Sequence, residues 1–165
     1  KFSRHDPSQF IWPEPASGAS SIGNNMRDLT EIIGHCPATR PNWRESQKIA
    51  IKPGEIKHWH LDLLWTDIGY HLVIDLDGTL VTGRPLAPMG AYGNGHNEDT
   101  IGVALMGGHG SAKKYFFSNY FTTEQGRAPS RCIADLKDQY PVIKTVGGHI
   151  KYAAKACPGL MSPAF

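Results

Sequence analysis

Long apolar runs, an excess of one charge and paired cysteines are all missing from this sequence. No stretch approaches the roughly 18 consecutive apolar residues of a membrane span, and residues 1–15 lack the apolar core of a signal peptide. Lys and Arg (17) nearly balance Asp and Glu (15), and a net charge of +2 does not indicate the excess of positive charge that is typical of proteins that bind nucleic acid. Three cysteines, Cys36, Cys132 and Cys157, argue against a disulfide framework because their number is odd. We therefore expect no membrane span, no nucleic-acid partner and at least one free thiol.

The composition that remains is typical of one globular domain. With 40% apolar and 19% charged residues, a chain of 165 residues can bury a core without disulfides. Pro7, Pro13 and Pro15 interrupt the start of the chain, which also contains a Ser/Gly/Ala run. We expect residues 1–28 to form an extended or partly disordered arm and residues 29–165 to form the domain.

Apolar spacing predicts a chain in which strands and helices alternate. Short runs rich in β-branched and aliphatic residues indicate strands at 29–35, 70–75, 79–82, 100–106 and 142–146. Residues 83–97 are rich in glycine and are expected to form a long surface loop of the kind that often carries function. The expected fold class is therefore α/β, with a mixed central β-sheet flanked by helices in a single domain.

Two helices are expected beside this sheet. The first spans residues 53–65, and its three- to four-residue spacing is carried by Ile56, Trp59, His60 and Leu63. The second ends near Tyr140. Thr122 and Gln125 match a capping box, but Pro129 lacks a backbone N–H, so we expect the regular helix to begin near Pro129 or to kink there.

Histidine and cysteine supply the candidate metal ligands. His149 and Cys157 lie eight residues apart in a segment containing Gly and Pro, and His35 ends the first expected strand. Neutral imidazole and thiolate are favoured zinc ligands, and three protein ligands with an open fourth position define a catalytic zinc site. Spacing alone leaves open whether each histidine is a ligand or a hydrogen-bonded core residue. Cys132 lies on the apolar face of a helix, which favours packing, and Cys36 should point away from His35 across a strand.

Five sequence blocks in a fixed order carry a resemblance to a known family. They read GHCPATRP (34–41), DIGYHLVIDLDGTLVTGRP (67–85), GHNEDTIGVALMGG (95–108), FTTEQ (121–125) and GHIKYAAKACPGL (148–160). Together they resemble the type-2 N-acetylmuramoyl-L-alanine amidases, which include amidase-type phage lysozymes and animal peptidoglycan recognition proteins. The resemblance covers about residues 29–160 and implies a mixed sheet with helices around it.

The resemblance also implies a set of site residues. His35, His149 and Cys157 match the ligands of one Zn²⁺ ion, and Tyr70 and Lys155 match the catalytic positions. Zinc polarises a carbonyl and lowers the pKa of its bound water to about 7. Lys155 would stabilise the oxyanion, and Tyr70 would hydrogen-bond the attacking water or shuttle its proton.

The loop at 83–97 is expected to line a groove for glycan and peptide. Trp65, Arg84 and Tyr92 are candidate substrate contacts there. Tyr92 stands where the family commonly has histidine, which places a phenol in this loop in place of an imidazole. Asn97 is expected to fix the loop through side-chain hydrogen bonds to the backbone.

Other histidines are expected to be structural. His71 follows Tyr70 in a strand and should face the other way. His58 and His60 lie on the first helix, where surface or packing roles are expected.

The implied reaction is zinc-dependent hydrolysis of the amide between N-acetylmuramic acid and L-alanine in peptidoglycan. The implied protein is a monomeric phage endolysin, made in the host cytoplasm and acting on the periplasmic or external cell wall, with a secreted form as the alternative. Two other functions stay open: a non-catalytic peptidoglycan-binding protein, and a zinc endopeptidase acting on stem-peptide cross-links. In the family that the sequence resembles, non-catalytic members lose a zinc ligand, often the cysteine, whereas residues matching all three ligands are present here.

Overall fold

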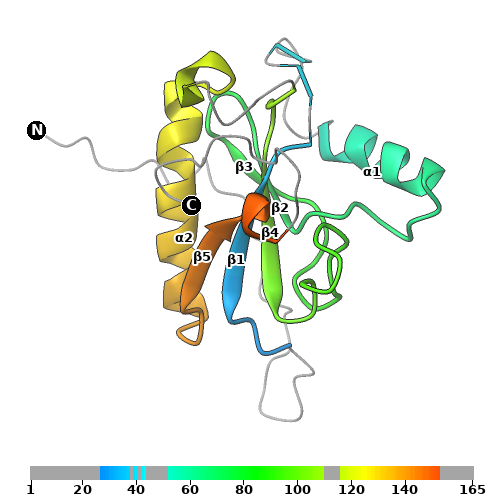
Figure 1. Ribbon diagram of the computed structural model, residues 1–165, viewed down its shortest axis with the longest axis vertical. Coiled ribbons are helices and arrows are strands. Elements are labelled where there is room, and N and C mark those ends of the chain that lie inside the picture. The colour runs from blue at the N-terminus through cyan, green and yellow to red at the C-terminus, as the bar shows by residue number, and fades with distance from the viewer. Residues whose placement is uncertain (1–26, 38, 41, 44–51, 110–115, 153–165) are drawn as a thin grey trace, which may run out of the picture.

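The computed structural model describes residues 27–37, 39–40, 42–43, 52–109 and 116–152, and these contain five strands. The strands are β1 (Glu31–His35), β2 (Leu72–Ile74), β3 (Leu80–Thr82), β4 (Thr100–Leu105) and β5 (Thr145–Gly148). They form one sheet in the order β3-β2-β4-β1-β5, in which β3 alone runs antiparallel to its neighbour (Figure 1). Of the expected arm at 1–28, only Arg27 and Asp28 belong to the described residues.

A helix lies on each side of this sheet, α2 (Thr123–Gln139) on one and α1 (Lys52–Asp62) on the other (Figure 1). The side chains of each strand alternate between the two sides. Those facing α2 form the larger core, for example Leu72, Ile101 and Leu105, which cluster with Leu136 of α2. The expected fold class, a mixed sheet flanked by helices in one domain, is confirmed.

Cys132 belongs to this core. Its side chain is buried against the sheet, and burial raises the pKa of the thiol to about 12. A thiol that stays protonated is a packing residue rather than a ligand or nucleophile, as expected from its place on the apolar face of the helix.

The position expected for β5 is wrong by several residues. The strand was expected at 142–146, but it spans Thr145–Gly148. The amide of Ile143 donates to the carbonyl of Tyr140 (3.0 Å), so a turn occupies the start of the expected strand. Pairing of Glu31 with Thr145 sets the register, and β-propensity at Val142 does not override it.

The expected start of the second helix is also wrong. α2 begins at Thr123 and runs through Pro129 without interruption. The capping box is present, because Thr122 Oγ1 accepts from the Gln125 amide (3.1 Å) and Gln125 Oε1 accepts from the Thr122 amide (3.1 Å). The Gln125 side chain is fully buried and also donates to the Met106 carbonyl (2.6 Å), so tertiary contact fixes the first turn before Pro129.

α1 differs from expectation in how it packs. Of the four residues whose spacing predicted this helix, only Ile56 is fully buried, where it joins Ile68, Val73 and Met106. The helix ends at Asp62 rather than at residue 65.

No helix among the described residues has both the length and the apolar character that a membrane crossing needs.

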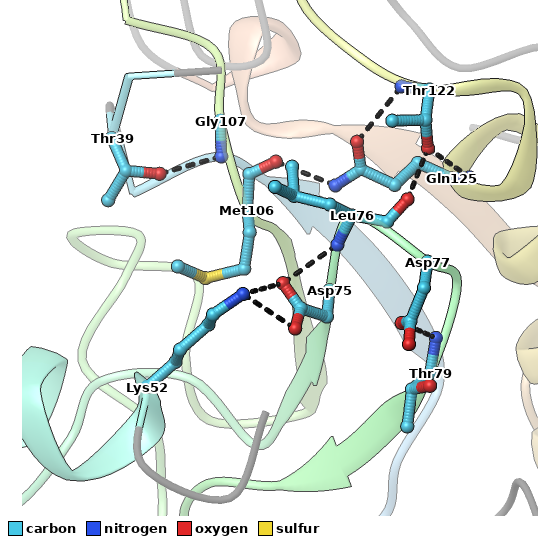
Figure 2. A network of polar contacts seen from close by, with 10 residues as sticks. All are labelled: Thr39, Lys52, Asp75, Leu76, Asp77, Thr79, Met106, Gly107, Thr122 and Gln125. Atoms are coloured by element: carbon cyan, nitrogen blue, oxygen red, sulfur yellow. Dashed lines mark hydrogen bonds and ion pairs between the residues drawn. The ribbon is translucent and has the colours of Figure 1, made fainter. Parts of the chain in front are cut away.

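A buried ion pair also joins α1 to the sheet. Lys52 Nζ donates to both carboxylate oxygens of Asp75, at 2.6 and 2.7 Å (Figure 2). Asp75 follows β2 and also accepts from the Leu76 amide (2.8 Å), and the Leu76 carbonyl accepts from Thr122 Oγ1 (2.5 Å). Figure 2 thus shows one polar network joining the start of α1, the end of β2 and the start of α2.

Candidate active site

Two of the expected zinc ligands lie side by side at one edge of the sheet. His35 is the last residue of β1, and His149 directly follows β5 and begins the short 3-10 helix η4 (His149–Lys151). The parallel register pairs Gly34 with Gly148, so both histidines emerge at the same edge. Their ring centroids are 4.7 Å apart, which brings two imidazoles to one point.

The third expected ligand, Cys157, and the expected catalytic Lys155 lie outside the described residues. Within the described ranges, no group of three His, Cys, Asp or Glu side chains is placed to hold a metal ion. The paired imidazoles of His35 and His149 fit two positions of a zinc site that has two histidines and one cysteine.

Tyr70 adjoins this histidine pair. Its ring centroid lies 5.5 Å from that of His35 and 5.6 Å from that of His60. His60 has the packing role expected for it, since its Nδ1 accepts from the Gly69 amide (2.9 Å) and its ring contacts Trp65 at 4.5 Å. Burial lowers the pKa of His60, which favours its neutral form.

A cavity of about 570 Å³ opens at His149. It lies among the expected loop, the end of β5 and the segment after α1, and its lining residues are Trp65, Ala91, Tyr92, Gly93, Asn94, Asn97, His149 and Tyr152. Two of the three expected substrate contacts, Trp65 and Tyr92, line this cavity. Arg84 is buried and donates to the Met89 carbonyl within the loop, so contact of Arg84 with substrate stays a prediction.

Tyr92 lines the cavity, and its hydroxyl points toward β4. The hydroxyl donates to the Thr100 carbonyl (2.7 Å), and burial raises the pKa of the phenol to about 12. The ring packs against His35 with centroids 4.8 Å apart. A Cβ atom at Gly90 or Gly102 would overlap this ring, so its position depends on two glycines. The expected phenol is therefore in the loop, but its oxygen already forms hydrogen bonds with Thr100.

Asn97 has the loop-fixing role expected from the sequence, and His71, which was expected to be structural, also contacts the loop. Asn97 Oδ1 accepts from the amides of Tyr92 (3.2 Å) and Gly93 (2.8 Å). His71 is fully buried, and its Nδ1 accepts from the Gly102 amide (3.1 Å). The imidazole proton is then on Nε2, which donates to the Pro88 carbonyl (3.1 Å).

Arg27 is a loop contact that sequence reasoning missed. Its guanidinium donates to the carbonyls of Leu86, Asn97 and Glu98 at 2.8, 2.8 and 2.7 Å, and so joins both ends of the loop. No local pattern marks Arg27, because its partners lie about 60 to 70 residues away.

Tyr152 is a cavity residue that sequence reasoning also missed. Its hydroxyl donates to the Glu31 carboxylate, and its ring lies 4.3 Å from that of His96. The signal available in the sequence was its place in the last block, three residues after His149.

Comparisons with known proteins agree on one family. The family described as N-acetylmuramoyl-L-alanine amidase matches residues 25–160. The endolysin of Escherichia phage T7 is 35% identical over 134 residues, which cover 81% of this chain and 83% of that protein. The endolysin of Enterobacteria phage T3 is 36% identical over 133 residues, covering 80% and 82%.

Solved structures share the fold. The amidase LysC from Clostridium intestinale URNW superposes with a TM-score of 0.67 at 24% identity, covering 85% of this chain and 83% of that one. Drosophila PGRP-LB superposes with a TM-score of 0.64 at 23% identity, covering 84% of each chain.

Proposed function

This chain belongs to the N-acetylmuramoyl-L-alanine amidase family, and we propose that it is a zinc-dependent endolysin that hydrolyses the amide between N-acetylmuramic acid and L-alanine in peptidoglycan. The family, the fold class and the amidase activity expected from the sequence are confirmed. The observation that carries the zinc proposal is the pairing of His35 and His149, whose ring centroids are 4.7 Å apart, with His149 lining the cavity.

His35, His149 and Cys157 would hold the ion. When bound, zinc supplies Lewis-acid polarisation of the scissile carbonyl and acidifies a water molecule. Ring contacts with Tyr92 and Tyr70 would restrict the orientation of the His35 ring and so hold its nitrogen in one direction.

Tyr70 and Lys155 would handle charge and protons around the reacting carbonyl. Tyr70 would hydrogen-bond the attacking water and relay its proton toward the leaving amine of L-alanine. Lys155, a compact cation, would stabilise the negative charge that develops on the carbonyl oxygen. The carbon–nitrogen bond then breaks, the glycan keeps a free lactyl carboxylate and the peptide keeps a free amine.

The cavity would receive the sugar next to the scissile bond. Its described lining has aromatic faces at Trp65, Tyr92 and Tyr152 and amide groups at Asn94 and Asn97, but no Asp, Glu, Lys or Arg. Such a lining suits a neutral ring with hydroxyl and acetamido groups better than a charged stem peptide. The protein would act as a monomer on the cell wall after synthesis in the host cytoplasm.

Mass analysis of digested, purified peptidoglycan tests the bond that is cleaved. We expect soluble peptides that begin with L-alanine and glycan chains without peptide. A chelator should stop the release and added Zn²⁺ should restore it. Cleavage within cross-links, with peptides still attached to glycan, would identify an endopeptidase, and binding to the wall without release would identify a non-catalytic protein.

The variant Cys157→Ala tests the metal site directly. It should lose bound zinc and abolish wall lysis, because removal of a ligand opens the site. Cys132→Ala is the matched control, since that thiol is buried in the α2 core, and it should keep its zinc. Full lysis by zinc-free Cys157→Ala would reject the metal mechanism.

A further inference from the structure

Exposed apolar side chains occur in the last turn of α1 and in the residues just after it. Leu63 and Leu64 are 62% and 93% exposed, and Leu61 is also exposed; we call these three residues the leucine tip. Trp59 and Trp65, both more than one-third exposed, flank it. Figure 1 shows the end of α1 and the turn after it at the outer edge of the molecule, away from the sheet. Monomeric proteins rarely leave clustered large apolar side chains in water without a function for them.

The backbone at Leu64 has a conformation that leucine rarely adopts. Leu64 has φ 65°, and it is the one non-glycine with positive φ among the residues the structure describes. The amide of Leu64 donates to the Leu61 carbonyl (2.9 Å) and that of Trp65 to the His60 carbonyl (3.0 Å), which ends the helix. Glycine is the residue that usually fills such a left-handed position after a helix. A leucine there is unfavourable both for the backbone and for hydration, so its side chain points to a use outside the fold.

We propose that the leucine tip inserts into the surface of a lipid bilayer, with Trp59 and Trp65 at the level of the headgroups. Leucine side chains gain free energy from leaving water for an acyl-chain region. Tryptophan is enriched at the boundary between membrane and water, where its ring is buried and its N–H stays hydrated. Along the chain, the two most exposed side chains, Leu63 and Leu64, lie between the two less exposed tryptophans, which matches this gradient.

Other occupants fit the leucine tip less well. A hydrated glycan offers hydroxyl and acetamido groups, for which leucine has no hydrogen-bonding partner. A stable protein interface needs about 20–30 residues on each side, and the tip with its two tryptophans supplies five. A second copy of this chain would therefore bury too little surface to hold.

The charges beside the leucine tip indicate apolar rather than electrostatic binding. Lys57 pairs with Asp67 (2.9 Å), and Asp62 is exposed at the end of α1. No cluster of basic side chains surrounds the tip in the described part of α1 and the turn after it. Binding should therefore depend little on anionic lipid and little on salt.

The location of the tip gives this binding a consequence for the enzyme. Trp65 belongs both to the flank of the tip and to the lining of the cavity at His149. A molecule seated on a bilayer through the leucine tip would hold the cavity close to that bilayer. It would then work on wall strands next to the membrane.

Vesicle flotation tests the proposal on the full chain. Vesicles of phosphatidylcholine alone, and of phosphatidylcholine with phosphatidylglycerol, are mixed with the protein at about 0.15 M and about 0.5 M salt. We expect binding to both compositions at both salt concentrations, with a blue shift of the tryptophan fluorescence. The variant Leu63→Ser/Leu64→Gly should partition roughly tenfold or more weakly, because two apolar side chains are lost.

A matched control separates the tip from surface hydrophobicity in general. Phe116 is 81% exposed and lies in a different segment, before α2, so Phe116→Ser should bind vesicles as the parent does. The Leu64→Gly change relieves the positive φ, and an unchanged or raised Tm would show that the double variant is folded. Hydrolysis of lipid-free peptidoglycan should be unchanged in both variants, so the lipid proposal and the amidase proposal fail separately.

Several results would overturn the proposal. These are no vesicle binding by the parent, equal binding by the double variant, or binding that needs phosphatidylglycerol and disappears at high salt. Loss of binding to lipid-free sacculi in the double variant would assign the tip to the wall. Self-association of the parent that the double variant abolishes would assign it to a second copy.

Discussion

At the scale of single residues, His71 shows how a buried histidine serves the site without joining its chemistry. It accepts from Gly102 of β4 and donates to Pro88 of the loop, so it joins the sheet to the cavity wall. The bond from Gly102 needs the neutral imidazole, because a protonated ring has no acceptor, whereas the Nε2–H group can donate to Pro88 in either state. Burial lowers the pKa of His71 from 6.5 to about 4.

This depressed pKa predicts a loss of stability in mild acid. Above pH 6.5 His71 is neutral in both states, and its full contribution is present; as pH falls from 6.5 toward 4, the unfolded chain takes up the proton first. The free energy of unfolding should fall by roughly 2 kcal/mol between about pH 7 and about pH 5 from this group.

Urea unfolding at the two pH values measures this effect. His71→Asn keeps an acceptor for the Gly102 amide and cannot titrate, so it should be less stable at neutral pH but lose less on acidification. An equally steep loss in His71→Asn would assign the pH dependence to other groups.

Lys155 carries a second prediction at this scale. Lys155→Ala should retain zinc but lower turnover by roughly 10²–10³, the effect of losing one oxyanion contact. Zinc content by metal analysis and single-turnover rates on peptidoglycan would check it, with the exposed Lys137→Ala of α2 as the control. An unchanged rate would show that Lys155 is not catalytic.

At the scale of elements, the loop at 83–97 depends on a residue far from it in sequence. Arg27 joins Leu86 at one end of the loop to Asn97 and Glu98 at the other. Three charge-assisted hydrogen bonds to backbone carbonyls order the segment that carries Tyr92 and Asn94 into the cavity wall.

Removing this contact should weaken substrate binding more than chemistry. We expect Arg27→Ala to raise KM for a soluble muropeptide roughly tenfold, with a smaller change in kcat and no loss of zinc, because His35 and His149 are on other elements. The exposed Arg40→Ala should leave KM unchanged. Lower stability with an unchanged KM would show that Arg27 has no part in positioning the loop.

Helix α2 shows which of two conflicting local signals prevails. Pro129 predicts a start or kink within the helix, and Thr122 with Gln125 predicts an earlier start. The capping residues prevail because each also has a tertiary partner, the Leu76 carbonyl for Thr122 and the Met106 carbonyl for Gln125. A proline that lacks one helical hydrogen bond, at a cost of about 3 kcal/mol, does not outweigh the packing of the whole helix.

At the scale of the whole molecule, α1 is held to the sheet by one buried ion pair and little apolar surface. Lys52→Met should lower the free energy of unfolding by about 3–5 kcal/mol, because it leaves the Asp75 carboxylate buried without its partner. Lys57→Met is the control: its side chain is 47% exposed, and loss of its pair with Asp67 should cost less than about 1 kcal/mol. Urea unfolding of both variants would check the difference, and equal small effects would contradict it.

Several features could be predicted from the sequence because they depend on local chemistry. The Asn97 turn, the capping box at Thr122 and the packing role of Cys132 each depend on a short segment and on general preferences. Tyr92 marks the limit of such reasoning. Its place in the loop was predictable, but the direction of its hydroxyl depends on Thr100 of β4 and on space above Gly102.

The order of sequence blocks by itself determined the family and the mixed sheet, because these depend on residue type and sequence spacing. Only the tertiary structure decided the register of β5, the Lys52–Asp75 pair, the Arg27 contacts and the outward direction of the leucine tip. Each of these depends on which distant segments meet, or fail to meet, when the chain folds. A burial pattern or an ion pair between two segments depends on how the segments pack together, so it cannot be predicted from the local sequence of either one.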